Sequence, residues 1–296
     1  DVGLFRYWSE RAAEDLFHIY QGDFFIDYPP FYIYILFIIG KISGFLGLGD
    51  GPLNLLLLKL PSILADLGTA FMLYYLAKDR LPGKWPLLAA SLYIFNPAVL
   101  INSSVWGQVD SFLVLLLALG FIMLDSKKPE FAGLPFAAAV LTKPQGLILL
   151  PVVLFELLKR GNWKALINTA VYGILTVILL ILPFAVNQEP SWIFKLYVNT
   201  AEGYKYASLN AFNFFSLIGA NLKPDSEKLL FVSYQAWGSF FIAAMLIFTA
   251  VMYRKGKGRP LMYISALVLF MGVFMFSIRM HERYMFPVMF FLAVLF

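Results

Sequence analysis

Long apolar runs separated by short polar segments dominate the chain from residue 54 to its end. A helix needs about 20 apolar residues to cross a bilayer, and most of these runs reach or approach that length. The candidate spans are residues 54–77, 85–103, 111–124, 165–185, 232–253 and 261–278, with one more starting at Met285. We therefore predict an all-α polytopic membrane protein.

Two shorter apolar runs, 131–141 and 146–158, flank Lys143 and Pro144. Neither is long enough for a full crossing, and the far end of each run meets a polar loop. We predict a pair of helices that enters the bilayer and returns, with its turn toward the outer half of the membrane.

The first 53 residues differ from the spans that follow them. Residues 3–18 carry apolar side chains on one stripe at helical spacing, which predicts an amphipathic helix in the membrane interface. The stripe consists of Phe5, Trp8, Ala12 and Leu16. Residues 30–46 are apolar, but a full crossing there would reverse the sense of the next span. We expect a second helix that lies in the outer interface or dips partly into the membrane.

Lysine and arginine gather in four short loops between the predicted spans. Cytoplasmic loops of membrane proteins carry an excess of these residues, so we assign all four loops to the cytoplasm. They are residues 78–84, 127–128, 159–164 and 254–259. The segments expected outside are then 1–53, 102–110, 187–230 and 279–284.

Composition agrees with this topology. Hydrophobic residues make up 60% of the 296 positions and charged residues 14%, whereas a soluble domain carries about 25% charged residues. The chain contains no cysteine, which excludes disulfides, thiolate metal sites and a cysteine nucleophile. The sequence begins at Asp1 and ends within an apolar run that is too short to cross. We expect a single transmembrane domain over 1–296, as a fragment lacking an N-terminal helix and a C-terminal remainder.

Acidic residues in the first outer segment are candidates for chemistry. Asp1 and the Asp27-Tyr28 pair lie at the expected boundary between water and membrane. A carboxylate there can act as a general base or bind a metal. The alternative is helix capping, which is open for Asp27 in particular because Pro29 and Pro30 follow it.

The loop 102–110 offers hydrogen-bonding groups that suit sugar hydroxyls. These are Asn102, Gln108 and Asp110, and Trp106 lies between them. Asp110 could instead cap the helix that follows.

Cations form two further clusters. Lys143, followed by Gln145, is expected at membrane depth, where a charge is a functional candidate by default. It could pair with a lipid phosphate, or it could snorkel or form a salt bridge. The segment 279–284 contains two arginines suited to phosphate binding, although head-group anchoring would also explain them. Its polar residues are Arg279, His281, Glu282 and Arg283.

Other polar residues leave more than one interpretation open. Lys59 and Asp66 are two turns apart on one face of a predicted span, and both packing and function stay open for them. The outer segment 187–230 contains Asn210 and Asn213, with tyrosines that could stack on sugars or anchor at the interface. No phosphate-binding glycine loop, zinc motif or nucleophile elbow is present, and the basic residues form no stripe for nucleic acid.

Seven motifs in order resemble the prokaryotic membrane mannosyltransferases related to the GPI second mannosyltransferase. More distantly, they are similar to the dolichyl-phosphate-glucose glucosyltransferases. The motifs are Asp1…Phe5…Trp8, Asp27-Tyr-Pro-Pro, Lys59-Leu-Pro…Ala65-Asp66, Asn96-Pro…Val105-Trp-Gly-Gln-Val-Asp110, Lys143-Pro-Gln, Asn210-Ala-Phe-Asn213 and Arg279-Met-His-Glu-Arg-Tyr284.

The resemblance implies a GT-C fold with two juxtamembrane helices in the first outer loop. It implies an inverting hexosyltransferase, with mannose favoured, that uses Asp1 as general base and a polyprenyl-phosphate sugar as donor. Candidates for the donor phosphate are Lys143, Arg279, His281 and Arg283. The other expected substrate-binding residues are Asp27, Tyr28, Asn102, Trp106, Gln108, Asp110, Gln145, Asn210, Asn213 and Glu282.

The expected partners are membrane lipids, the donor, and a glycan, lipid or protein acceptor. The expected location is a prokaryotic cell membrane with the site facing outward. No cofactor is required, although a divalent metal could bind Asp1 with Asp27 or Asp110. Two alternatives are a transporter or flippase of lipid-linked sugars, and a non-catalytic membrane scaffold. Polar motifs gathered on one face favour the enzyme over the transporter.

Overall fold

The computed structural model describes residues 1–22, 24–258 and 260–295. The chain divides into two compact units. Unit 1 consists of Asp1–Gly146 and Ile167–Val198, and unit 2 of Leu147–Leu166 and Asn199–Phe296. The expected single domain stays a prediction.

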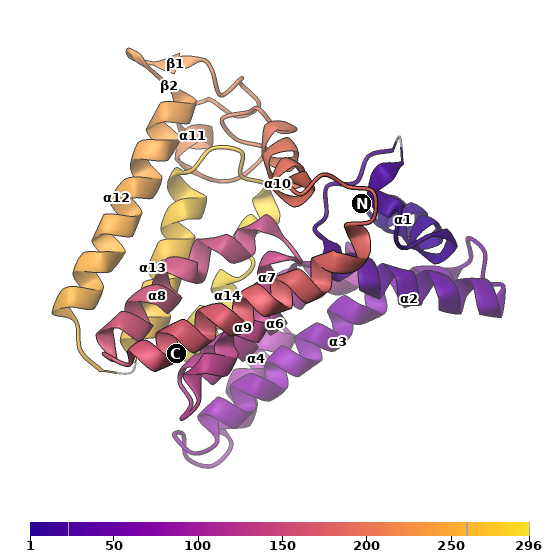
Figure 1. Ribbon diagram of the computed structural model, residues 1–296. Coiled ribbons are helices and arrows are strands. Elements are labelled where there is room, and N and C mark those ends of the chain that lie inside the picture. The colour runs from indigo at the N-terminus through magenta and orange to yellow at the C-terminus, as the bar shows by residue number, and fades with distance from the viewer. Residues whose placement is uncertain (23, 259, 296) are drawn as a thin grey trace. The chain divides into compact units, whose positions relative to one another are not determined.

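Unit 1 begins with two helices that pack closely against each other, α1 (Val2–Glu14) and α2 (Pro30–Leu46), as Figure 1 shows. Gly40 of α2 lies so close to α1 that a Cβ atom there would come within 2.0 Å of the Ser9 carbonyl oxygen. The predicted helix over 30–46 is confirmed, whereas the one over 3–18 ends at Glu14. It ends there because Asp15 adopts an extended backbone and its carboxylate accepts the His18 backbone N–H at 3.3 Å.

The rest of unit 1 is a bundle of apolar helices. It contains α3 (Pro52–Ala77), α4 (Trp85–Ile94), α5 (Pro97–Leu100), α6 (Asp110–Leu124), α7 (Gly133–Val140), and most of α9 (Trp163–Ile181) and α10 (Trp192–Glu202). Short 3-10 turns occur at η1 (Ile19–Gln21), η3 (Pro129–Ala132), η4 (Pro144–Leu149, which continues into unit 2) and η5 (Leu182–Phe184).

The span predicted over 85–103 is broken in the structure. Helix α4 ends at Ile94, and Asn96 caps the next helix by accepting the Ala98 N–H at 2.9 Å. Pro97 has no N–H to continue the helical ladder, and the segments before and after it meet at 44°. A π-helical turn, η2 (Ile101–Val105), then leads into the polar loop.

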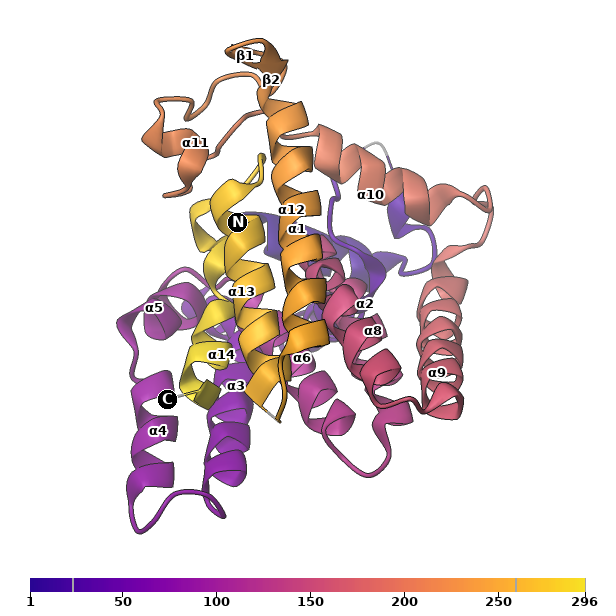
Figure 2. The same cartoon turned by 90° about the vertical axis from the view of Figure 1, so that its left-hand side faces the viewer.

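Unit 2 is built on two long helices, α12 (Tyr234–Lys255) and α13 (Pro260–Phe276), which lie side by side in Figures 1 and 2. Helix α8 (Leu150–Lys159) packs against both. A two-stranded hairpin, β1 (Lys228–Leu229) and β2 (Val232–Ser233), precedes α12. The predicted span from 232 therefore starts two residues later, after Ser233 caps it. The remaining elements are α11 (Phe214–Leu217), η6 (Glu282–Met285) and α14 (Val288–Leu295).

Among the described residues, three helices are long and apolar enough to cross a membrane: Pro52–Ala77, Trp163–Phe184 and Tyr234–Lys255. The bent pair around Pro97 would make a fourth. Helices α2, α6 and α13 are apolar but shorter. The chain is therefore an all-α polytopic membrane protein, as its sequence predicts.

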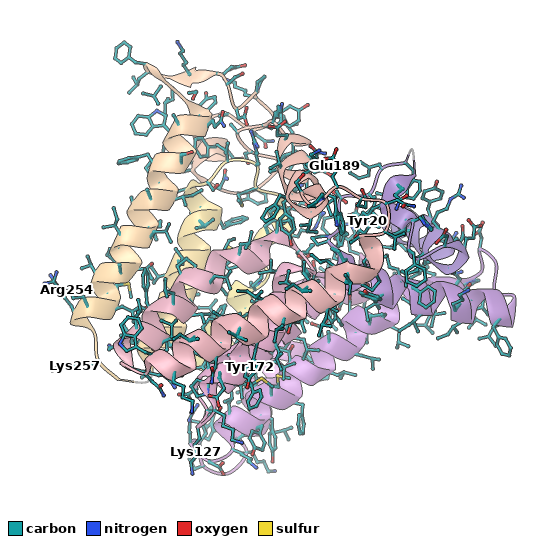
Figure 3. All side chains as sticks on the ribbon, viewed as in Figure 1. Tyr20, Lys127, Tyr172, Glu189, Arg254 and Lys257 are labelled. Carbon is teal, nitrogen blue, oxygen red and sulfur yellow. The ribbon has the colours of Figure 1, made fainter. Side chains whose placement is uncertain are left out.

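Within each unit, the basic loops come together at one end. Arg80 lies 3.9 Å from Asp125 in unit 1, which brings the loops 78–84 and 125–128 together. In unit 2, Lys159 Nζ donates to the Gly256 carbonyl at 2.6 Å, which brings the loops after α8 and α12 together. In Figure 3, Lys127 lies at the opposite end of unit 1 from Glu189. This segregation agrees with the sidedness expected from the positive loops.

Candidate functional site

The Asp1 carboxylate lies at the start of α1 and contacts the loop before α6. Asp1 is the residue that precedes the first turn of α1, but its side chain makes no capping hydrogen bond. Instead, its Oδ2 accepts a hydrogen bond from Gln108 Nε2 at 2.5 Å. The Gln108 side chain is completely buried, so this amide fixes the orientation of an exposed carboxylate.

Backbone hydrogen bonds hold the loop that contains Gln108. The π-helical turn η2 closes with the Trp106 N–H donating to the Ile101 carbonyl at 2.8 Å. The Gln108 N–H then donates to the Asn102 carbonyl, also at 2.8 Å. Gly107 lies between them with φ at +77°, in the left-handed region that favours glycine.

A buried ion pair lies on the other side of this loop. Lys143 Nζ is 2.6 Å from Asp110 Oδ1, and the two side chains are only 5% and 2% exposed. The pair joins the start of α6 to the turn that follows α7. The salt-bridged interpretation of Lys143 is therefore confirmed, and its role toward a lipid phosphate stays a prediction. Two buried charges are tolerated when they are paired in this way.

Aromatic side chains line the same region of unit 1. Lys143 Nζ lies 5.7 Å from the centre of the Tyr28 ring, within cation–π range. The Tyr28 ring packs in turn against Phe5 and Trp8 of α1, with ring centres 5.5 and 5.4 Å away. Phe5 and Trp8 are almost fully buried, so this aromatic wall belongs to the core of unit 1 and holds the Tyr28 ring beside the ion pair.

Tyr20 fixes the backbone beside this wall. Its hydroxyl donates to the Tyr28 carbonyl at 2.7 Å. Burial raises the pKa of Tyr20 well above its usual value, with smaller contributions from Tyr197 and Tyr34. The hydroxyl therefore remains a donor at any physiological pH. The sequence analysis missed Tyr20 because nothing in its local pattern marks it.

Two capping interpretations are wrong. Helix α2 begins at Pro30 with Pro29 before it and no side-chain cap, so Asp27 does not cap this helix. Asp110 is the first residue of α6 rather than the capping residue, which is Val109, and its carboxylate is used by Lys143. Asp27 is instead close enough to Tyr20 to influence it electrostatically.

The charged pair Lys59 and Asp66 on α3 both contact the broken span, which confirms that they share a face. Lys59 Nζ donates to the carbonyls of Ser104 and Val105 at 3.0 and 2.8 Å. Asp66 is 2% exposed, and its Oδ1 lies 3.4 Å from the Tyr93 hydroxyl.

For three predicted residues of unit 1, contact with substrate stays a prediction. Asn102 is buried and its Nδ2 has no partner among the described residues, as is also true of Gln145 Oε1. Trp106 is 39% exposed on the loop.

Unit 2 holds the second predicted cluster, and Arg279 organises it. Arg279 has a left-handed backbone, with φ at +61°. Its Nη2 lies 2.6 Å from Asp225 Oδ2 and its Nη1 donates to the Ala201 carbonyl at 2.7 Å. Arg279 thus ties the segment 279–284 to two points of the segment 187–230. Asp225, 93% buried as a side chain, was missed by the sequence analysis because it is 54 residues away along the chain.

His281 lies between two tyrosine rings in the same cluster. Its ring centre is 5.1 Å from that of Tyr204 and 5.0 Å from that of Tyr284. Arg283 Nη1 lies 3.5 Å from Glu282 Oε1. The segment 281–283 is half-buried, and the Arg283 side chain is 17% exposed.

Asn210 and Asn213 line one cavity of about 780 Å³ in unit 2, together with apolar side chains that include Phe212 and Phe276. Asn213 caps α11 through the Ser216 N–H. Asn210 and Asn221 pair through two hydrogen bonds, at 2.8 and 3.0 Å. These amides therefore have structural roles, and their predicted contact with substrate stays a prediction.

Among the described residues, no group of three or more His, Asp or Glu side chains is arranged to hold a metal ion. A divalent metal bound by Asp1 with Asp27 or Asp110 stays a prediction.

Residues 25–277 of the chain match the model of one protein family, described as Glycosyltransferase family 87. The match covers most of the 296 residues and includes five of the seven motifs, since those at Asp1–Trp8 and Arg279–Tyr284 lie outside it. No curated protein matches the chain.

Proposed function

Because this chain belongs to glycosyltransferase family 87, we propose that it moves a hexose, with mannose favoured, from a polyprenyl-phosphate donor to an acceptor hydroxyl. The reaction takes place at the outer membrane face, on a GT-C fold, with inversion at the anomeric carbon. The observation that carries this proposal is the Asp1 carboxylate oriented by the buried Gln108 amide. Membership of a transferase family favours this function over a flippase or a scaffold.

In the proposed reaction, Asp1 takes the proton of the acceptor hydroxyl. The acceptor oxygen then bonds to the anomeric carbon from the face opposite the phosphate. The bond between this carbon and the phosphate oxygen breaks, and polyprenyl phosphate leaves with both bonding electrons. A general base of this kind contributes about 10²–10⁴-fold to the rate. The Gln108 contact supports this role because it fixes the carboxylate in one orientation.

The leaving phosphate needs positive charge nearby. In unit 1 our candidate is Lys143, whose ammonium is held in place by Asp110. In unit 2 the candidates are His281 and Arg283. Arg279 is less suited, since its guanidinium already binds Asp225 and Ala201.

The decisive experiment measures transfer of radiolabelled sugar by the full-length protein, with polyprenyl-phosphate mannose and polyprenyl-phosphate glucose as donors. We expect transfer by the parent and a loss of about 10²–10⁴-fold in Asp1→Asn, with donor binding retained. The matched control is Asp50→Asn, because Asp50 is an exposed acid that pairs with Arg6 on α1. Full activity in Asp1→Asn would exclude Asp1 as the base. Saturable donor binding without transfer would favour the flippase.

The phosphate candidates of unit 2 have a separate test. We expect Arg283→Gln to raise the Kd for the donor by about tenfold, as for loss of one charge-assisted contact. The control is Arg254→Gln, at the end of α12 that lies far from the β1–β2 hairpin in Figure 3. An equal effect of both substitutions would point to a general electrostatic effect instead.

A further inference from the structure

Lys59 is a cation in an apolar helix. It lies in α3, one of the helices long enough to cross a membrane. No carboxylate among the residues that the structure describes forms an ion pair with it. Its ammonium group instead binds two backbone carbonyls, those of Ser104 and Val105. A buried or partly buried lysine normally has a reason for its position, and this contact supplies one.

The two carbonyls need a donor because of where the π-helical turn stops. The last carbonyls of any helical segment lack the N–H groups of a following turn. The turn η2 ends at Val105, and the chain then reverses at Gly107. A lysine that donates to such terminal carbonyls satisfies them and complements their partial negative charge.

A continuous series of contacts leads from Lys59 to Asp1. Gly107 packs on the Lys59 side chain and on Val2, since a Cβ atom there would lie 3.1 Å from Lys59 Cγ and 2.9 Å from Val2 Cγ2. The next residue, Gln108, holds the Asp1 carboxylate. Lys59 therefore contacts the loop on both sides of Trp106, directly before the residue that orients Asp1.

We propose that Lys59 is a positioning residue: its ammonium group fixes the 101–108 loop so that Gln108 orients the Asp1 carboxylate. This inference rests on the proposed function of Asp1 as general base. Lys59 itself touches neither the substrate nor the reacting atoms in this proposal. Its removal should therefore impair the chemical step more than donor binding.

The test compares Lys59→Met and Lys59→Arg in the full-length protein. We expect Lys59→Met to lower kcat by roughly a hundredfold, the effect of a small misplacement of a reacting group, while KM for polyprenyl-phosphate mannose stays within about threefold. Lys59→Arg keeps the charge and the donors and should recover most of the rate. Lys59→Gln keeps a hydrogen-bond donor but not the charge, so its kcat should lie between those of the other two variants. It replaces Lys59→Met if that variant does not fold. The control is Lys41→Met, because Lys41 is an exposed lysine on α2 that lies over Phe37.

A second readout does not depend on transfer. The chain has no cysteine, so Val105→Cys, at a side chain that is 68% exposed, accepts a single nitroxide label on the loop. We expect the label to become more mobile in Lys59→Met and to be restored by Lys59→Arg. An unchanged label, or a rise in KM with kcat unchanged, would overturn the inference. A parent without transfer activity but with the expected change in mobility would refute only the proposed function.

Discussion

Lys143 and Asp110 are each held in the interior by the other. Neither charge would be tolerated there alone, because removing one partner of a buried pair leaves an uncompensated charge. Their side chains also belong to the proposed substrate site. Stability and activity can therefore be separated at this pair by experiment.

We expect Lys143→Met and Asp110→Leu to destabilise the protein by about 3–5 kcal/mol each, and the double variant to regain most of this loss. Thermal unfolding in detergent measures the stability. All three variants should lack transfer activity. Lys195→Met is the control: it removes half of an exposed ion pair with Glu189, and such surface pairs contribute little to stability because solvent screens them. A double variant no more stable than the single ones would show that the polar pair itself is needed for folding.

Gly107 allows a second test at the residue scale. Alanine there must adopt a positive φ, which costs about 1–2 kcal/mol, and its Cβ would also press on Val2 and Lys59. Gly49 has a positive φ as well, but no atom lies within 4 Å of its Cβ position. We expect both substitutions to lower stability, Gly107→Ala more than Gly49→Ala, and a loss of transfer in Gly107→Ala alone. Equal transfer activity in the two variants would show that the conformation of the 101–108 loop does not affect catalysis.

Helix packing decides where α1, and hence Asp1, is placed. Gly40 and Gly44 lie one turn apart on α2, but only Gly40 meets α1, since a Cβ at Gly44 has no neighbour within 4 Å. Alanine should stabilise a helix relative to glycine by about 0.5–1 kcal/mol.

We therefore expect Gly44→Ala to be neutral or slightly stabilising, and Gly40→Ala to destabilise the protein and lower transfer, because it pushes α1 away from α2. The measurements are the melting temperature and the rate of sugar transfer. If Gly40→Ala left the melting temperature unchanged, α1 could move away from α2 without loss of stability.

At this scale, periodicity predicted the helices well. The apolar runs gave α2 and α3 nearly to the residue, since Pro30 and Pro52 start them and glycine follows α2 at Gly47. The break at Pro97 was missed because the apolar run continues through it. The Arg279–Asp225 pair was not predictable either, because it joins segments with no shared pattern.

In the whole molecule, the proposed orientation places the basic loops in the cytoplasm. Single cysteines at Lys127 and Lys257 should be protected from a membrane-impermeant maleimide in intact cells, and cysteines at Asp50 and Glu189 should react. The physical reason is the preference of Lys and Arg for cytoplasmic loops. All four sites should react after lysis. Labelling of Lys127 or Lys257 in intact cells would reverse the orientation and with it the outward-facing site.

The ion pair between the start of α6 and the turn after α7 also bears on biosynthesis. When α6 leaves the ribosome, Lys143 has yet to be made, and Asp110 would enter the lipid without its partner, which costs free energy. Once α7 has emerged, the two charges can enter as a neutral hairpin. We therefore expect the insertion machinery to retain α6 until α7 arrives and to release both helices together.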